Sequence, residues 1–530
     1  MAADVDAATL KAWLSDGSEI AVLDTREHGQ YGMGHLFFAV PLPYSRFELG
    51  LPLLVPNPAV RLVLCDDGDG VAAHAAARAE ELGYSQVHVL KGGADAWRQA
   101  GYTLYAGVNV PSKTFGELVE HERHTPRVTA PALQAMREAG ENFVIVDGRP
   151  FAEYHKMNIP GGICCPNGEL ALRIRDIVPD PATPIVVNCA GRTRSIIGAQ
   201  LLIDFGVPNP VYALENGTQG WTLAGLKLEH GASRRYSGQI HARDAAGLAA
   251  RARALAERRG VGYVAPGVAH GWLADKSRTT YFLDVRTDEE VAANGLPGFG
   301  RAPGGQLIQV TDQWVGIKGA RLVLVDEELV RAPVVAGWLR QLGHETYVLA
   351  GGIAAAGAYS WRRRGPPNLQ PLSLDPLRPT TPAELAEALK AETVQVIDLR
   401  SSMAFRNGHI PQARWAVRSR IAAAVVPRTA IVLVTDEPPV AALAALDLAE
   451  AGHKDVRLLA GGQGAWCAAG LPVVATPELP ADADCIDFLF FTHGRHDGNH
   501  EAARQYLAWE TGLVGQLDAQ ERGVFRVAGG

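Results

Sequence analysis

Residues 184–206 read PIVVNCAGRTRSIIGAQLLIDFG and carry the strongest fold signal in the chain. The apolar run 184–188 predicts a short buried strand, and the run from Ile196 to the glycine stop at Gly206 predicts a helix. A strand that feeds a helix through a short loop is typical of βα units, which build a mainly parallel sheet covered by helices on both faces. We therefore expect an α/β fold.

The same unit occurs four times along the 530 residues. Each copy opens on an apolar run that ends in Asp-x-Arg, and a second apolar run follows it. The opening runs are AVLDTR at 21–26, VIVDGR at 144–149, YFLDVR at 281–286 and VQVIDLR at 394–400, and the second runs end at Cys65, Cys189, Asp326 and Asp436. Because two independent landmarks keep the same register, the sequence predicts four repeated α/β domains.

The landmarks also predict where the domains begin and end. The four domains are expected at 1–108, 126–228, 261–366 and 378–476. An Arg- and Ala-rich stretch predicts a linker helix at 229–260, and the Pro-rich residues 365–382 separate the last two domains. A tail at 477–530 lies outside the repeat, with a helix expected at 499–518.

Composition excludes several classes of protein. Hydrophobic residues make up 47% and charged residues 20% of the chain, which excludes wholesale disorder and a fibrous fold. The net charge of −7 gives no global reason to bind nucleic acid or an anionic membrane. Six irregularly spaced cysteines do not form a disulfide framework, and we find no signal peptide and no long apolar span. We therefore expect a cytoplasmic protein.

The loop after the second strand of the second copy has the composition of a nucleophile site. Cys189 follows a strand directly and precedes a helix, so backbone N–H groups and the positive end of the helix dipole face it. Arg192 and Arg194 add positive charge, which is expected to lower the pKa of the thiol and to attract anions. Gly191 permits the tight curl of the loop.

These motifs resemble the rhodanese family of sulfurtransferases. The resemblance rests on the Cys-x4-Arg loop and on three accessory signatures, and it extends over all four copies. The matching segments are Cys189–Arg194, Asp147-Gly148-Arg149, Ile159-Pro160-Gly161-Gly162 and Glu215-Asn216-Gly217 with Gly220-Trp221. The resemblance implies that Cys189 carries sulfur as a persulfide, that Ala190, Gly191, Arg192, Thr193, Arg194 and Ser195 form the substrate loop, that Asp147 and Arg149 support it, and that no cofactor or metal takes part.

The loop also discriminates among related enzymes. Phosphatases of similar design use a longer Cys-x5-Arg loop for a tetrahedral oxyanion, so phosphate is disfavoured here. Mercaptopyruvate sulfurtransferases lack the two arginines, which favours thiosulfate as the donor. The acceptor is expected to be a thiol, cyanide or a protein. Glu153 stands where two-domain rhodaneses carry an arginine. A mercaptopyruvate enzyme and a persulfide carrier without useful small-molecule turnover remain the alternatives.

The other three loops are degenerate. Cys65 is followed by Asp66, Asp67 and Asp69, whose negative charges are expected to raise the pKa of that thiol and to repel anions. Asp326 and Asp436 replace the nucleophile altogether. We expect the three remaining domains to pack, orient or recognise rather than to catalyse.

Several other residues have a structural interpretation beside a functional one. The Asp147–Arg149 motif recurs in copies without a nucleophile, which favours a structural ion pair. Cys164 and Cys165 are interpreted as packing residues, with a role as resolving thiols as the alternative. His493, His496 and His500 lack the spacing of a zinc site and are expected in a solvated loop. Aromatic and leucine side chains are expected to dock the tail helix on a domain: Tyr506, Trp509, Leu513 and Leu517.

Overall fold

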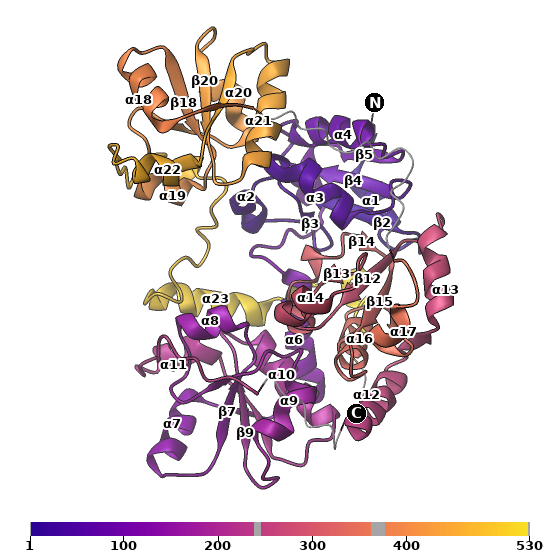
Figure 1. Ribbon diagram of the computed structural model, residues 1–530. Coiled ribbons are helices and arrows are strands. Elements are labelled where there is room, and N and C mark those ends of the chain that lie inside the picture. The colour runs from indigo at the N-terminus through magenta and orange to yellow at the C-terminus, as the bar shows by residue number, and fades with distance from the viewer. Residues whose placement is uncertain (1, 238–244, 362–376, 528–530) are drawn as a thin grey trace. The chain divides into compact units, whose positions relative to one another are not determined.

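The computed structural model describes residues 2–237, 245–361 and 377–527, and in them the chain forms four parallel sheets flanked by helices (Figure 1). In every sheet the first strand of the repeat pairs with the last one, and the second and third strands lie at the opposite edge. The predicted fold of four repeated α/β domains is therefore confirmed.

The strands of the four sheets have the following bounds. The first sheet contains β1 (Ala3–Val5), β2 (Ile20–Asp24), β3 (Val40–Pro41), β4 (Arg61–Cys65) and β5 (Val87–Leu90), and the second β6 (Arg127–Val128), β7 (Val144–Asp147), β8 (Ile163–Cys164), β9 (Ile185–Asn188) and β10 (Val211–Leu214). The third contains β11 (Gly262–Val264), β12 (Thr280–Asp284), β13 (Gly300–Arg301), β15 (Arg321–Val325) and β16 (Glu345–Leu349). The short β14 (Ile317–Lys318) lies between β13 and β15 in the chain but is not a strand of this sheet. The fourth contains β17 (Arg378–Thr380), β18 (Val394–Asp398), β19 (Arg414–Trp415), β20 (Ala430–Val434) and β21 (Val456–Leu459).

The helices follow the strands in each repeat. Those of the first domain are α1 (Ala7–Trp13), α2 (His28–Met33), α3 (Phe47–Leu54), α4 (Val71–Glu81) and α5 (Gly93–Gln99), and those of the second α7 (Ala130–Glu138), α8 (Phe151–Lys156), α9 (Leu170–Ile177), α10 (Thr193–Asp204) and α11 (Gly217–Leu223), preceded by α6 (Val110–Arg123). The third has α13 (Pro266–Gly271), α14 (Asp288–Asn294), α15 (Gly304–Gln309), α16 (Arg331–Gln341) and α17 (Gly352–Ala356), and the fourth α18 (Pro382–Lys390), α19 (Ser402–Asn407), α20 (Ile421–Ala424), α21 (Pro438–Glu450) and α22 (Gly462–Ala468).

The chain divides into two compact units. One holds the first and fourth sheets, and the other holds the second and third sheets together with the segment from Thr492 onward. The loop of Cys189 therefore belongs to the same unit as the third domain and the C-terminal helix.

Alternation along the strands of the second sheet explains its two helix layers. Val186 belongs to a core cluster with Leu133 of α7 and Trp221 of α11. The next residue, Val187, points to the other face, where a Cβ at Gly198 of α10 would approach its side chain to 2.9 Å. The two layers hold β9 between them and so fix the position of the loop at its carboxyl end.

The linker helix predicted for 229–260 is shorter than expected. The helix α12 spans Ala245–Arg258, and residues 238–244 lie outside the described part of the chain. Residues 229–237 are not helical, because they run along the second domain and bond to its edge. The N–H of Asn158 donates to the carbonyl of Glu229 (2.8 Å), and that of Cys164 donates to Arg234 (2.9 Å). An edge strand has unpaired N–H and C=O groups, and hydrogen bonds to them replace the helical hydrogen bonds of such a segment. Most of the Pro-rich linker also lies outside the described residues.

The tail contains one long helix, α23 (His500–Gly512), and the short helices η5 (Asp482–Asp484), η6 (Val514–Gln516) and α24 (Ala519–Arg522). The helix expected at 499–518 thus ends early, in a stretch that holds Gly512 and Gly515, which are poor helix formers. In residues 2–237, 245–361 and 377–527, none of the helices has both the length and the apolarity needed to cross a bilayer.

Candidate functional site

Cys189 lies directly after β9 and before α10, and only 2% of its surface is exposed. The N-terminal end of α11 holds the loop from one side. The N–H of Thr218 donates to the carbonyl of Cys189 (2.9 Å), and that of Gln219 donates to Ala190 (3.2 Å). Gly217 has a φ of +53°, and a Cβ there would lie 2.2 Å from the carbonyl oxygen of Cys189. The glycine turn predicted after the last strand is therefore what allows α11 to approach the loop.

The backbone N–H groups distinguish this loop from two of the degenerate ones. In the first loop, Asp66 accepts from the N–H groups of Gly68 (2.8 Å), Gly70 (3.0 Å) and Ala72 (2.9 Å). In the third loop, Asp326 accepts from Val330 (3.0 Å) and Arg331 (2.9 Å). Each of these loops holds a carboxylate of its own.

No such carboxylate occupies the second loop. Within the described part of the chain, the N–H groups of residues 190–195 donate no hydrogen bond to another protein group. Ser195 instead donates its hydroxyl to the carbonyl of Arg192 (2.8 Å), which ties the two ends of the curl together. The second loop thus offers N–H donors for an external anion.

Arg192 does not present a free positive charge to this loop. Its guanidinium group donates to both carboxylate oxygens of Glu117 (2.7 Å and 2.9 Å) and pairs with Glu120 as well. It also donates to the side-chain oxygen of Asn216 (3.2 Å). Both glutamates belong to α6, which in the chain follows the first predicted domain and precedes the second.

Arg194 is paired too. It donates two hydrogen bonds of 2.8 Å to the carboxylate of Glu153 in α8. Burial by itself lowers the pKa of Arg194, but the charge of Glu153 and, further down, that of Cys189 raise it above its ordinary value. The cation is therefore close enough to interact with the sulfur. Glutamates from α6 and α8 thus pair with both arginines that were expected to add positive charge around Cys189.

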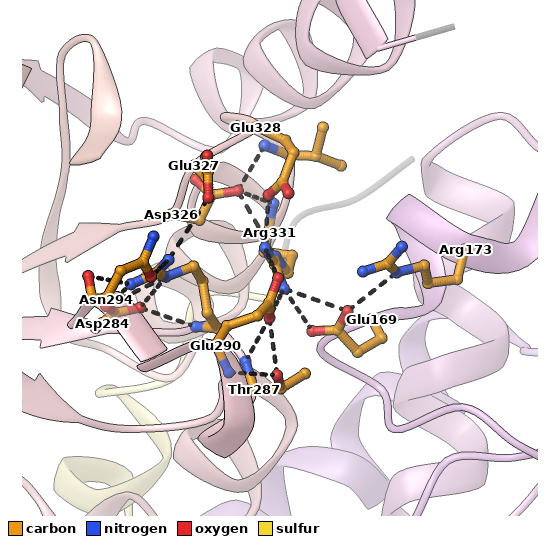
Figure 2. Close-up of polar contacts among 12 residues, drawn as sticks. Glu169, Arg173, Asp284, Thr287, Glu290, Asn294, Asp326, Glu327, Glu328 and Arg331 are labelled. Atoms are coloured by element: carbon orange, nitrogen blue, oxygen red, sulfur yellow. Dashed lines mark hydrogen bonds and ion pairs between the residues drawn. The ribbon is translucent and has the colours of Figure 1, made fainter. Parts of the chain in front are cut away.

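The third loop repeats this arrangement without a nucleophile. Arg331, which is fully buried, pairs with Glu290 of α14 (2.7 Å), with Glu328 (2.6 Å) and with Glu169 of the second domain (3.1 Å). Figure 2 shows the guanidinium group between these carboxylates, with Asp326 beside it. Burial raises the pKa of Asp326 to about 6. The degenerate loop has become part of the contact between the second and third domains.

The Asp-x-Arg motif is an ion pair in all four repeats. Arg149 donates to both oxygens of Asp147 (2.9 Å and 2.7 Å) and to the carbonyl of Met157 (2.6 Å). Asn188 donates to Asp147 from the last position of β9, directly before Cys189 (2.9 Å). The equivalent pairs have the same bidentate geometry: Asp24 with Arg26, Asp284 with Arg286, and Asp398 with Arg400. The structural interpretation of this motif is therefore the correct one.

Three other buried cysteines of the first two domains have environments that disfavour a thiolate. Burial, together with the charges of Asp24, Asp66 and Asp67, raises the pKa of Cys65 well above its usual range. Burial also raises the pKa of Cys164 to about 12, and it raises the pKa of Cys165 well above its usual range. All three are free thiols.

In the fourth loop, Asp436 stands where the second loop has Cys189, and its side chain is exposed.

Two elements outside the predicted domains complete the site. Thr193 donates its hydroxyl to Glu510 of α23 (2.7 Å), and Lys113 of α6 lies 3.6 Å from the same carboxylate oxygen. The sequence predicted the tail helix and its docking on a domain, but it did not place either element at this loop. The one available signal was the spacing of Lys113, Glu117 and Glu120, which places three charges on one face of a helix.

The histidines of the tail do not behave alike. His493 and His500 are exposed as expected, whereas His496 is half-buried against the second domain. Burial, with the charges of Arg495 and Arg149, lowers the pKa of His496 to about 4. The described residues contain no group of three or more histidine, cysteine or acidic side chains placed to hold a metal ion.

Comparison with known proteins adds to this geometry. The chain matches the rhodanese-like domain over residues 6–100, 129–224 and 381–469. It is similar to the crystal structure of a thiosulfate sulfurtransferase from Pseudomonas aeruginosa, with 43% identity, a TM-score of 0.90 and 99% of each chain covered. It is also 36% identical over 105 residues to an HTH-type transcriptional regulator of Mycobacterium tuberculosis; this match spans 20% of the chain and 45% of the regulator.

Proposed function

This chain belongs to the rhodanese-like family and is a sulfurtransferase, and from that premise we propose that Cys189 is its nucleophile and thiosulfate its sulfur donor. The observation that carries the proposal is the set of unengaged N–H groups at residues 190–195. In the equivalent loops of the first and third domains, Asp66 and Asp326 accept hydrogen bonds from such N–H groups. An anionic substrate or intermediate suits those donors.

The reaction proceeds in two half-reactions. The Cys189 thiolate attacks the outer sulfur of thiosulfate, the sulfur–sulfur bond of thiosulfate breaks, and sulfite leaves with the bonding electron pair. The persulfide that remains on Cys189 is an anion held by the loop N–H groups. A nucleophile such as cyanide or a thiolate then attacks the terminal sulfur and releases the Cys189 thiolate.

The preference for thiosulfate rests on the two arginines of the loop and on the similarity to a known enzyme. The loop carries two arginines, and the similar protein from Pseudomonas aeruginosa is a thiosulfate sulfurtransferase. Both arginines are paired with glutamates, so binding of the dianion depends mainly on the N–H groups and the helix dipole of α10. We further propose a small-molecule donor, a thiol or cyanide acceptor, and a cytoplasmic location that suits six unpaired cysteines.

Intact-mass analysis after treatment with thiosulfate tests the proposal. We expect one added sulfur on the peptide that contains Cys189, and thiosulfate:cyanide turnover that is lost in Cys189→Ser. Cys65→Ser is the matched control, because Cys65 occupies the same position in the first repeat, and it is expected to retain turnover. Turnover that disappears only in Cys65→Ser would overturn the assignment. A stable adduct without turnover would favour the persulfide carrier instead.

A further inference from the structure

The C-terminal segment 492–512, here called the cap, lies against the loop of Cys189 although it is outside the repeat. In Figure 1 its helix α23 lies beside α6, and it also contacts α11 of the second domain. A Cβ at Gly191 would lie 3.2 Å from a carboxylate oxygen of Glu510 and 3.2 Å from a ring carbon of Tyr506. The cap therefore covers the part of the loop that follows the nucleophile.

Buried polar contacts fasten the cap at this point. Glu510 is 1% exposed, and its Oε1 accepts from Thr193 of the loop (2.7 Å) and faces the ammonium group of Lys113 (3.6 Å). The same ammonium group donates to the hydroxyl of Tyr506. The second oxygen of Glu510, Oε2, has no hydrogen-bond partner in the described residues although it is buried and adjoins Gly191. Opening the cap would leave Lys113 without its counter-ion, so the closed position is favoured.

The other end of the cap lies on the opposite side of the site. His496 is near enough to Arg149 and Glu153 for their charges to act on its imidazole, and Glu153 is the partner of Arg194. Asp497 adds an exposed contact to Lys156 of α8 (3.4 Å). The cap thus spans the loop from Gly191 to the Arg194–Glu153 pair.

We propose that Tyr506 and Glu510 are specificity-determining residues that restrict the sulfur acceptor to small nucleophiles and exclude protein thiols. The inference rests on the proposed function of Cys189. With the cap in place Cys189 as a residue is only 2% exposed, so a nucleophile carried on a folded protein cannot reach a persulfide there. A diatomic anion or a small thiol needs far less clearance.

The experiment compares a small and a large acceptor in the full chain. The probes are cyanide and reduced thioredoxin, and the measured quantity is the ratio of kcat/KM for thioredoxin to kcat/KM for cyanide. We expect this ratio to rise about tenfold or more in Glu510→Gln and in Tyr506→Phe, because each removes a contact that closes the cap. Glu501→Gln on the exposed face of α23 is the matched control and should leave the ratio at its wild-type value. A ratio that stays unchanged in both test variants would overturn the proposal.

Alkylation of Cys189 tests the cap independently of sulfur transfer. Iodoacetamide and a fluorescein maleimide are compared by peptide mapping, which separates Cys189 from the exposed Cys467. The wild type and Glu501→Gln should label far more slowly with the bulky reagent, and the two test variants should lose most of that difference. Equal labelling of the wild type by both reagents would overturn the cap. A size-selective labelling pattern without a persulfide on Cys189 would instead reject the proposed function and keep the cap.

Discussion

The guanidinium group of Arg194 donates two hydrogen bonds of 2.8 Å to the carboxylate of Glu153, so this cation of the Cys189 loop is neutralised inside the protein. Arg331 and Glu290 repeat this pairing in the third domain, where no nucleophile is present. The second and third domains thus share this pair whether or not a cysteine is present, and the second domain adds Cys189 and unengaged N–H groups to it.

Removing the carboxylate should strengthen donor binding. In Glu153→Gln, Arg194 keeps a hydrogen-bond acceptor but loses its counter-charge, so the loop becomes more positive. We expect the KM for thiosulfate to fall about 3- to 10-fold at low ionic strength and the gain to shrink at about 0.5 M salt. Steady-state kinetics with kcat and KM measured separately checks this. The exposed Glu141→Gln is the control and should change neither value; an unchanged or higher KM in Glu153→Gln would contradict the prediction.

The glycine turn after β10 should be essential for activity. In Gly217→Ala the new methyl group would lie 2.2 Å from the carbonyl oxygen of Cys189, at a φ of +53°, so the loop must shift. We expect kcat/KM to fall about 100-fold, as a displacement of about 1 Å does in a positioned site. Gly462→Ala makes a similar clash, 2.6 Å from the carbonyl of Thr435, in a loop without a nucleophile. It should lower stability by about 1–3 kcal/mol yet preserve the activity of the folded enzyme, and loss of activity in both variants would refute the distinction.

Arg331 should matter for stability far more than a surface arginine. Its side chain is fully buried among Glu169, Glu290 and Glu328, so Arg331→Met removes the counter-ion that these carboxylates share. The expected cost is about 3–5 kcal/mol in the urea-induced unfolding of the domain pair. Arg301→Met, which removes the exposed pair with Asp288, should cost about 0–1 kcal/mol. Equal costs for the two variants would show that the cluster in Figure 2 does not stabilise the contact.

Acid should weaken the same cluster through Glu290. Burial by itself raises the pKa of this carboxyl group, but hydrogen bonds and charge from Arg331, with hydrogen bonds from Thr287, bring it from 4.5 down to about 2. The folded state therefore binds fewer protons than the unfolded state in this range. The stabilisation is fully present above pH 4.5 and is lost as the pH falls toward 2.

A pH series of urea midpoints measures this contribution. The stability of Glu290→Gln should fall less between pH 4.5 and pH 2 than that of the wild type, because the variant has no carboxyl group to protonate. The neighbouring exposed Glu289→Gln should follow the wild type. Parallel curves for the wild type and Glu290→Gln would be the contrary result.

Local sequence was sufficient for the fold, and it singles out Cys189 as the candidate nucleophile. The apolar strand before Cys189, the helix after it and the recurring Asp-x-Arg ends are signals between residues close in the chain, and four copies in one register reinforce them. The helix predicted over 229–260 is shorter in the structure because residues 229–237 form hydrogen bonds along the edge of the second domain. No local sequence pattern indicates these bonds.

By itself, the sequence determined the four-domain architecture, the loop that follows β9 and the absence of a nucleophile from the third and fourth loops. Only the tertiary structure decided the charge of the site and the access to it. Arg192 is neutralised by Glu117 across 75 residues, Arg194 by Glu153 across 41, and Thr193 bonds to Glu510 across 317. Hydrophobic periodicity and turn chemistry act between chain neighbours, whereas Coulomb interactions and burial depend on distances in space that folding alone sets.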